Sequence, residues 1–137
     1  MANSLDMQIA HEGHKNAIVK ITGTLDDGDI SLTPAISIDD FTNNEPRLEL
    51  SGFRVNALQW TATDGLNLNI AWNGTNPQQI FTVSGHGNLC AKNFGGFYPE
   101  TARDGYDGNI NLYSNGAPNS NGVSAYFTII LELIKLY

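Results

Sequence analysis

The chain has 137 residues, a length that suits one domain, and its 14 acidic residues against 7 basic ones give a net charge of −7. This charge disfavours nucleic-acid binding, because phosphate contacts need clustered lysine or arginine and the basic residues here stand singly. The single cysteine, Cys90, excludes an intramolecular disulfide framework, and we expect it to be a small buried hydrophobe in a strand. Sixteen Asn and fourteen Gly favour turns over helices and indicate an all-β protein.

The N-terminal sequence has neither the basic start nor the apolar core of a signal peptide. No apolar run in the chain reaches the roughly 18 residues that a membrane-spanning helix needs. We therefore expect a protein that is made in a cytoplasm and has no membrane partner.

The first predicted strand covers residues 17–25. Residues 1–13 before it are expected to form an N-terminal arm that can extend onto a neighbouring subunit. The turn sequence Asp-Asp-Gly at 26–28 predicts a hairpin between the first strand and a short extended segment at 29–32.

The clearest strand pattern lies at 66–73, where apolar residues alternate with asparagines, so that one face is expected in the core and the other in water. Residues 47–55 and 57–63 are predicted as two strands before it, with Gly52 as a candidate bulge. The Asp-Gly pair at 64–65 predicts a tight hairpin turn into the 66–73 strand.

The long irregular stretch at 91–108 is expected to be held in place by packed aromatic side chains, namely Phe94, Phe97, Tyr98 and Tyr106. Further strands or extended segments are predicted at 35–38, 79–84, 88–92, 109–113 and 124–137.

About eight or nine short strands at a spacing of roughly ten residues, without a helical period, favour a two-sheet architecture. We therefore predict an all-β fold, a jelly-roll-like β-sandwich that forms a single domain over residues 1–137. The periodicity leaves the strand order open, because different sandwich topologies share it.

The terminal run at 124–137 is apolar on both faces of the predicted strand. A strand of this kind needs cover on both sides, and a homo-oligomer interface can supply the second cover. We therefore predict that a subunit interface includes Phe127, Ile129, Leu131, Leu133, Ile134, Leu136 and Tyr137.

Histidines and acidic residues form no catalytic or metal-binding pattern in the sequence. The segment 11–14, His-Glu-Gly-His, lacks the helical spacing of a zinc hydrolase, and a surface loop is favoured. His86 is interpreted as a solvated turn residue. Acidic runs at 26–29 and 104–109 resemble fragments of calcium loops but lack the full ligand pattern, so turns are favoured there.

The candidate nucleophiles and catalytic acids also form no recognisable catalytic motif. Ser84 lacks the Gly-x-Ser-x-Gly elbow, and the scattered carboxylates offer no preferred pair for glycoside hydrolysis. We therefore predict no catalytic residue, no metal ligand and no cofactor, and hence a protein that is not an enzyme.

An aromatic platform for sugars is an alternative that the composition leaves open. Its candidate members are Trp60, Trp72, Tyr98 and Tyr113. Trp72 shares the apolar face of the 66–73 strand, so core packing is favoured for it.

The order of the turn and strand signatures along residues 14–137 carries a family resemblance. These signatures are Trp60, Asp64-Gly-Leu, Ile70-Ala-Trp, Val83-Ser-Gly-His-Gly, Phe94-Gly-Gly-Phe with Pro99, Gly108-Asn-Ile-Asn-Leu, and the run from Ala125 to Lys135. In this order they resemble the small all-β structural proteins of tailed-bacteriophage virions.

The resemblance implies a capsid decoration or cement protein, made in the host bacterial cytoplasm and located in the virion. It implies the major capsid protein as the partner and a homo-oligomer, with a trimer favoured. The family has no catalytic residues to carry over. A tail, head–tail junction or receptor- or glycan-binding virion component is the alternative, because such proteins use similar small sandwiches.

Overall fold

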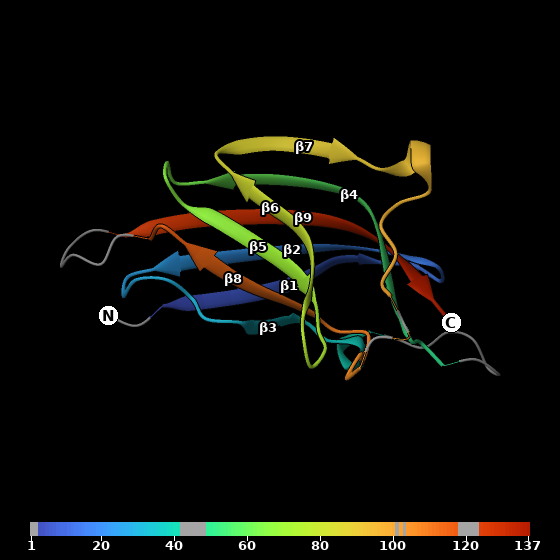
Figure 1. Cartoon of the computed structure of the whole chain (residues 1–137). Coiled ribbons are helices and arrows are strands. Elements are labelled where there is room, and N and C mark those ends of the chain that lie inside the picture. The colour runs from blue at the N-terminus through green and yellow to red at the C-terminus, as the bar shows by residue number, and fades with distance from the viewer. Residues whose placement is uncertain (1–2, 42–48, 101, 103, 118–123) are drawn as a thin grey trace.

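Nine β-strands form two antiparallel sheets that face each other in the computed structural model of the chain, which describes residues 3–41, 49–100, 102, 104–117 and 124–137 (Figure 1). The five-stranded sheet contains, in spatial order, β1 (Ser4–Glu12), β2 (Asn16–Leu25), β9 (Ala125–Leu136), β4 (Gly52–Ala62) and β7 (His86–Cys90). The four-stranded sheet contains β3 (Thr33–Ile36), β8 (Ile110–Asn115), β5 (Asn67–Trp72) and β6 (Gln78–Ser84). Two short 3-10 helices, Ile38–Asp40 and Lys92–Phe94, lie in connections between strands.

The strands pair as a folded ribbon, β2 with β9, β3 with β8, β4 with β7 and β5 with β6. Wrapping of this ribbon brings β4 beside β9 and β8 beside β5, which completes the two sheets. This connectivity is a jelly roll with β1 added at one edge. The predicted all-β, jelly-roll-like sandwich of eight or nine strands is confirmed.

The predictions of hairpins at 26–28 and 64–65 are wrong: a turn forms at each place, but the strands on its two sides do not pair with each other. The backbone N–H of Leu66 donates to the carbonyl of Thr63, and Gly65 adopts a φ of +85°, which glycine tolerates best. Each turn, however, connects a strand of one sheet to a strand of the other. A turn signal reports the local reversal of the chain and not the identity of the paired strand.

Residues 4–12, expected as part of an arm, form the edge strand β1, which pairs with β2 across a turn at 13–15. Leu5, Met7 and Ile9 alternate with exposed polar residues and pack against the core. This period of two was present in the sequence and indicates a half-buried strand. Within the described parts of the chain, no helix is long and apolar enough to span a membrane.

β4 is one continuous strand where the sequence predicted two, and residues 47–48 of the earlier prediction lie outside the described residues. The pairing of β4 with β9 shifts register between Val55 and Ala57, which places a bulge at Asn56 and not at Gly52. After the extra residue, the side chains of β4 that would have faced the core face outward, and the reverse. Ala57 therefore faces outward, while Leu58 returns to the core.

The core lies between the two sheets, and β9 supplies its centre. Side chains of β9 at alternate positions are at most 3% exposed, namely Ala125, Phe127, Ile129, Leu131 and Leu133. They pack with buried residues of the facing sheet and of neighbouring strands, among them Leu68, Ile70, Trp72 and Leu112. The β5 alternation predicted at 66–73 is confirmed for its apolar face.

Only part of the stretch at 91–108 is anchored by aromatic rings as predicted. Phe97 exchanges backbone hydrogen bonds with Val55, and its ring lies edge-on to Phe81 at 4.5 Å. Phe94 lies edge-on to Phe97 at 5.2 Å and Tyr98 receives a hydrogen bond from Arg54, but the two side chains are 62% and 55% exposed, so they are packed on one side only. Backbone pairing at Phe97 orders this segment, and it needs fewer buried rings than we expected.

Gly23 on β2 gives the first test of the packing. A Cβ at this position would meet the ring of Phe127, its cross-strand partner on β9. We expect Gly23→Ala to lower the free energy of unfolding by about 1–3 kcal/mol, because overpacking displaces a buried ring. Thr22→Ala, one residue away on the outer face, is the control and should change stability by less than about 1 kcal/mol. Urea unfolding of both variants measures the difference, and equal effects would contradict the close approach of Phe127.

Candidate interaction surface

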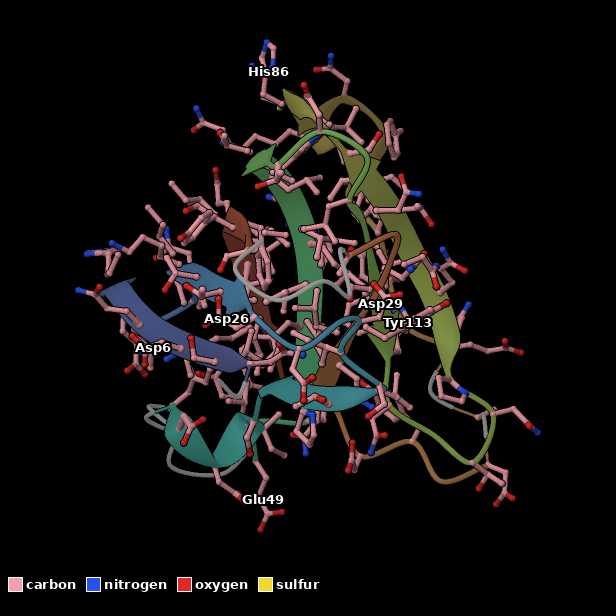
Figure 2. All side chains as sticks on the ribbon, turned by 90° about the vertical axis from the view of Figure 1, so that its left-hand side faces the viewer. Asp6, Asp26, Asp29, Glu49, His86 and Tyr113 are labelled. Atoms are coloured by element: carbon pink, nitrogen blue, oxygen red, sulfur yellow. The ribbon has the colours of Figure 1, made fainter. Side chains whose placement is uncertain are left out.

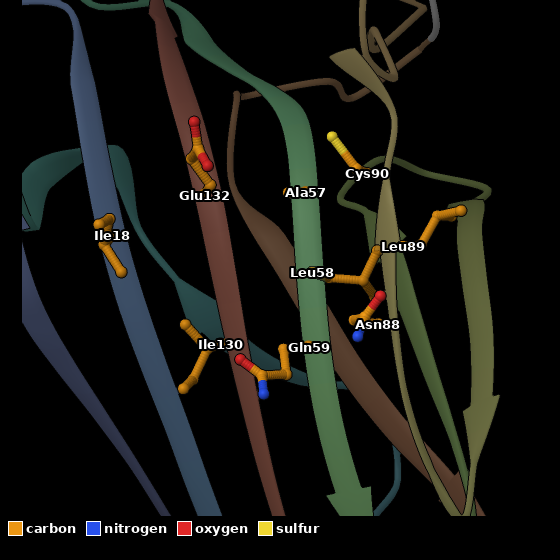
Figure 3. Close-up of a pocket in the computed structure, with 9 residues that line it drawn as sticks. All are labelled: Ile18, Ala57, Leu58, Gln59, Asn88, Leu89, Cys90, Ile130 and Glu132. Carbon is orange, nitrogen blue, oxygen red and sulfur yellow. The ribbon is translucent and has the colours of Figure 1, made fainter. Parts of the chain in front are cut away.

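A shallow groove crosses the outer face of the five-stranded sheet, the face turned away from the other sheet (Figure 3). It spans β2, β9, β4 and β7 and encloses about 360 Å³. We call it the Ala57 groove. Its lining residues are Ile18, Ala57, Leu58, Gln59, Asn88, Leu89, Cys90, Ile130 and Glu132.

Strand register explains why the groove lies where it does. One cross-strand row runs from Ile18 through Glu132 and Ala57 to Cys90. Ala57 has the smallest side chain of this row, and it faces outward only because of the bulge at Asn56. A low point therefore forms between longer side chains on the neighbouring strands.

The rim of the Ala57 groove is partly apolar. Ile18 on β2 is 37% exposed, and Ile130 on β9 is half-buried. Leu89 on the edge strand β7 pairs with the core residue Leu58, so its 38% exposed side chain points to the other face of the sheet and only its backbone side borders the groove. Large apolar side chains that share one exposed depression mark a surface suited to contact with another molecule.

An ion pair borders the groove. Lys92 Nζ lies 3.0 Å from Glu132 Oε1, and both side chains are accessible to water. The hydrogen bond to Glu132, followed by the negative charge of Glu132, raises the pKa of Lys92. Because the pair is exposed, its main contribution is a defined polar border and not stability.

Next to the groove, the outer face carries a polar row that is rich in threonine. Thr22, Thr128 and Thr61 form one cross-strand row, with Asp6 and His86 at its two ends. Threonines opposite each other on adjacent strands stabilise the pairing of those strands. The residues that line the groove all lie on paired strands and not on a loop.

The predicted interface residues separate into two groups. Phe127, Ile129, Leu131 and Leu133 point between the sheets and are at most 3% exposed, so they are part of the chain's own core and unavailable to a second subunit. Ile134 and Leu136 are half-buried on the outer face. Tyr137 packs against the core, and its hydroxyl donates to the carbonyl of His14 at 3.1 Å.

The prediction of the interface therefore needs a correction in its residues. The second face of β9, together with Ile18 of β2, carries the apolar surface that a partner could reach. The sequence pattern placed Ile130 on that face. The contribution of Ile18 was missed, because it depends on β2 lying next to β9.

Cys90 also departs from its prediction. It is exposed and lines the Ala57 groove, whereas we expected a buried residue. The reason is its register: Cys90 pairs with Ala57, which faces outward, and β7 is an edge strand.

Residues with catalytic chemistry do not converge in the described structure. His11 lies on β1 and His86 on β7, at opposite edges of the five-stranded sheet, and Figure 2 shows His86 far from Asp6 of β1. Among the described residues, no group of three His, Cys, Asp or Glu side chains could hold a metal ion. Asp107 accepts from the backbone N–H of Asn109, as an acidic residue does in a turn.

The candidate sugar-binding aromatics do not form one platform either. Trp72 is buried in the core, and Trp60 donates its ring N–H to the carbonyl of Ser84. Tyr98 receives a hydrogen bond from Arg54 at 2.8 Å, with the guanidinium above its ring. Tyr113 lies on the outer face of the four-stranded sheet, away from the other three.

Searches against protein-family models and curated proteins found no match to this chain. The geometry of the surfaces therefore carries the functional argument.

Proposed function

We propose that the chain is a non-enzymatic structural protein of a tailed-bacteriophage virion, and specifically a capsid decoration or cement protein. It binds the major capsid protein and stabilises the shell, and it is made in the host bacterial cytoplasm. The observation that carries this proposal is the Ala57 groove, a partly apolar depression on the outer face of the five-stranded sheet.

The fold agrees with this proposal at the level of analogy. Jelly rolls occur in viral capsid proteins and in lectins, where one sheet face is free to meet a partner. Here the connectivity leaves the outer face of the five-stranded sheet free of other elements of the described chain (Figure 1). Function is thus argued from that face and not from the fold.

The groove is suited to a contact that is repeated many times. Its volume of about 360 Å³ accommodates a few apolar side chains, far fewer than an interface that is stable on its own. On a shell, many copies act together, and a homo-oligomer such as a trimer engages several sites at once, which multiplies the affinity. The net charge of −7 keeps the free protein soluble before assembly.

Two variants with the same added charge test the docking surface. Ile18→Asp places a carboxylate on the apolar rim of the groove, whereas Thr24→Asp places it on the same strand and face at the other end. We expect Ile18→Asp to weaken binding at least about tenfold and Thr24→Asp to leave it nearly unchanged, because only the first desolvates a charge. Co-sedimentation with shells from a phage lacking this gene measures binding, and thermal melts confirm folding.

Copy number separates the decoration protein from its alternatives. Quantitative mass spectrometry of purified virions should find hundreds of copies of a shell protein, because shell sites repeat with the capsid symmetry. A count near a dozen would support a tail, head–tail junction or receptor-binding component instead. If virions contain none of the protein and it does not bind shells, the proposed function is wrong.

A further inference from the structure

The outer face of the four-stranded sheet is covered by amide and hydroxyl side chains around one tyrosine. We call it the amide face. Strand register places its members in adjacent rows on β6, β5 and β8, namely Ser84, Asn67 and Asn115, then Thr82, Asn69 and Tyr113, then Gln79, Ala71 and Asn111. A polar outer face is ordinarily the solvated face of an antiparallel sheet, so only particular features of the amide face can indicate a ligand site.

Asn69 is buried on this face with one atom unpaired. Its side chain is only 4% exposed, and its Oδ1 accepts from Thr82 Oγ1 at 2.8 Å and from Gln79 Nε2 at 3.1 Å. In this orientation the amide oxygen has two donors. The Nδ2 group is left as a buried donor with no hydrogen-bond partner.

Asn111 on β8 is also buried, but its unpaired atom is an acceptor and not a donor. It is 3% exposed, and its Nδ2 donates to Asn73 Oδ1 at 2.7 Å, while Asn73 Nδ2 donates to Asp107 Oδ2 at 2.8 Å. A carboxylate only accepts, so Asp107 sets the direction of this chain of hydrogen bonds. The Oδ1 of Asn111 is left as a buried acceptor with no partner.

The unpaired donor and the unpaired acceptor are close neighbours. Asn69 pairs with Tyr113 across the sheet, and Asn111 lies two residues before Tyr113 on the same face of β8. Asn69 and Asn111 are thus diagonal neighbours, at a separation of roughly 7 Å between backbones. Buried amide atoms are rarely left unpaired, and a hydroxyl that donates to Asn111 and accepts from Asn69 would satisfy both.

A pocket of about 600 Å³ adjoins Tyr113. Leu32 and Pro77 line it, together with Ile30 and Asn115, and Figure 2 shows Asp29 beside Tyr113. Asp29 Oδ1 accepts from Ser114 Oγ and from the backbone N–H of Ala117, so this oxygen is engaged within the protein. No lysine or arginine lines the pocket, which disfavours an anionic ligand.

We propose that the amide face and the pocket beside Tyr113 bind a neutral carbohydrate. One face of the sugar ring packs on Tyr113. Asn69 Nδ2 and Asn111 Oδ1 are buried in the unliganded chain, so the side chains around them shift on binding to admit the hydroxyl group that bridges the two atoms. A sugar hydroxyl is both donor and acceptor, which matches this pair of amides, and an aromatic ring takes the apolar face of a sugar. The inference does not rest on the proposed function, because the Ala57 groove lies on the other sheet.

The test uses the full chain and a panel of neutral oligosaccharides, namely maltotriose, cellotriose, galactobiose and chitotriose, with sialyllactose as the anionic comparison. We expect saturation-transfer NMR to detect at least one neutral member, with a Kd between about 10 μM and 10 mM by titration. Sialyllactose should give no stronger signal, because no cationic side chain lines the site.

Matched tyrosine variants locate the site. Tyr113→Ala should weaken binding at least about tenfold, whereas Tyr126→Ala, which removes an exposed tyrosine from the five-stranded sheet, should leave it unchanged. Asn69→Asp removes the Nδ2 donor with little change of shape and should also weaken binding, with folding checked by an amide NMR spectrum. The inference is overturned if no neutral sugar binds at about 10 mM, or if both tyrosine variants lose binding equally.

Discussion

Replacing Leu131 with alanine should lower the free energy of unfolding by about 3 kcal/mol or more. Leu131 is fully buried at the middle of β9, with Val19 and Leu58 as its cross-strand neighbours. Truncation removes buried methyl groups and leaves a cavity that flanking strands on both sides hinder from closing. Urea unfolding, monitored by tryptophan fluorescence, measures the change.

Ile130→Ala, on the next residue and the opposite face, is the matched control. Ile130 is half-buried on the rim of the Ala57 groove, so its truncation should cost less than about 1.5 kcal/mol. Binding to shells should show the opposite order. Ile130→Ala should weaken binding and Leu131→Ala should not, because only Ile130 contacts the partner. If Leu131→Ala changed binding and not stability, the two faces of β9 would be the reverse of those described.

The sequence predicted β9 well and its role only in part. The run at 124–137 predicted a strand covered on both faces, and β9 is the central strand of the five-stranded sheet. Only the face with Ile129, Leu131 and Leu133 is buried in the described chain, whereas Ile130 and Glu132 on the other face line a groove. What the pattern could not reveal is which face meets the other sheet. That choice depends on neighbouring strands, and it assigns Leu131 to the core and Ile130 to the surface.

The position of the bulge at Asn56 could not be predicted from the sequence. A bulge exists only relative to a partner strand, and β4 pairs with β9 on one side and β7 on the other. Gly52 was the local candidate because glycine is frequent at bulges. Without the bulge Ala57 would share the core face with Val55, so the floor of the groove could not be derived from the sequence.

The amide face could be anticipated in its composition but not in its geometry. The asparagines of 66–73 were assigned to a polar face, which holds for Asn67. Asn69 is instead almost fully buried, because β6 and β8 lay Thr82, Gln79 and Tyr113 around it. Cross-strand neighbours, which are distant in sequence, convert a solvated amide into a buried one with an unpaired atom.

Removal of the Glu12 carboxylate should destabilise the protein by about 3 kcal/mol or more. Lys135 faces the core side of β9 opposite Phe53, and its side chain is completely buried. Its Nζ lies 2.7 Å from Glu12 Oε2, and the Glu12 side chain is 20% exposed. In Glu12→Ala, the ammonium group loses a carboxylate in a place that water hardly reaches, and the lost attraction is large because the site is desolvated.

A double-mutant cycle separates this ion pair from simple packing. Lys135→Met keeps the aliphatic stem and removes the charge, so Glu12→Ala combined with Lys135→Met should be much more stable than Glu12→Ala alone. Urea unfolding of the four proteins should give a coupling energy above about 1.5 kcal/mol. Additive effects would show that the two groups act independently. Because Glu12 ends β1 and Lys135 lies near the end of β9, a large coupling would also show that this ion pair links the edge strand β1 to β9 across β2.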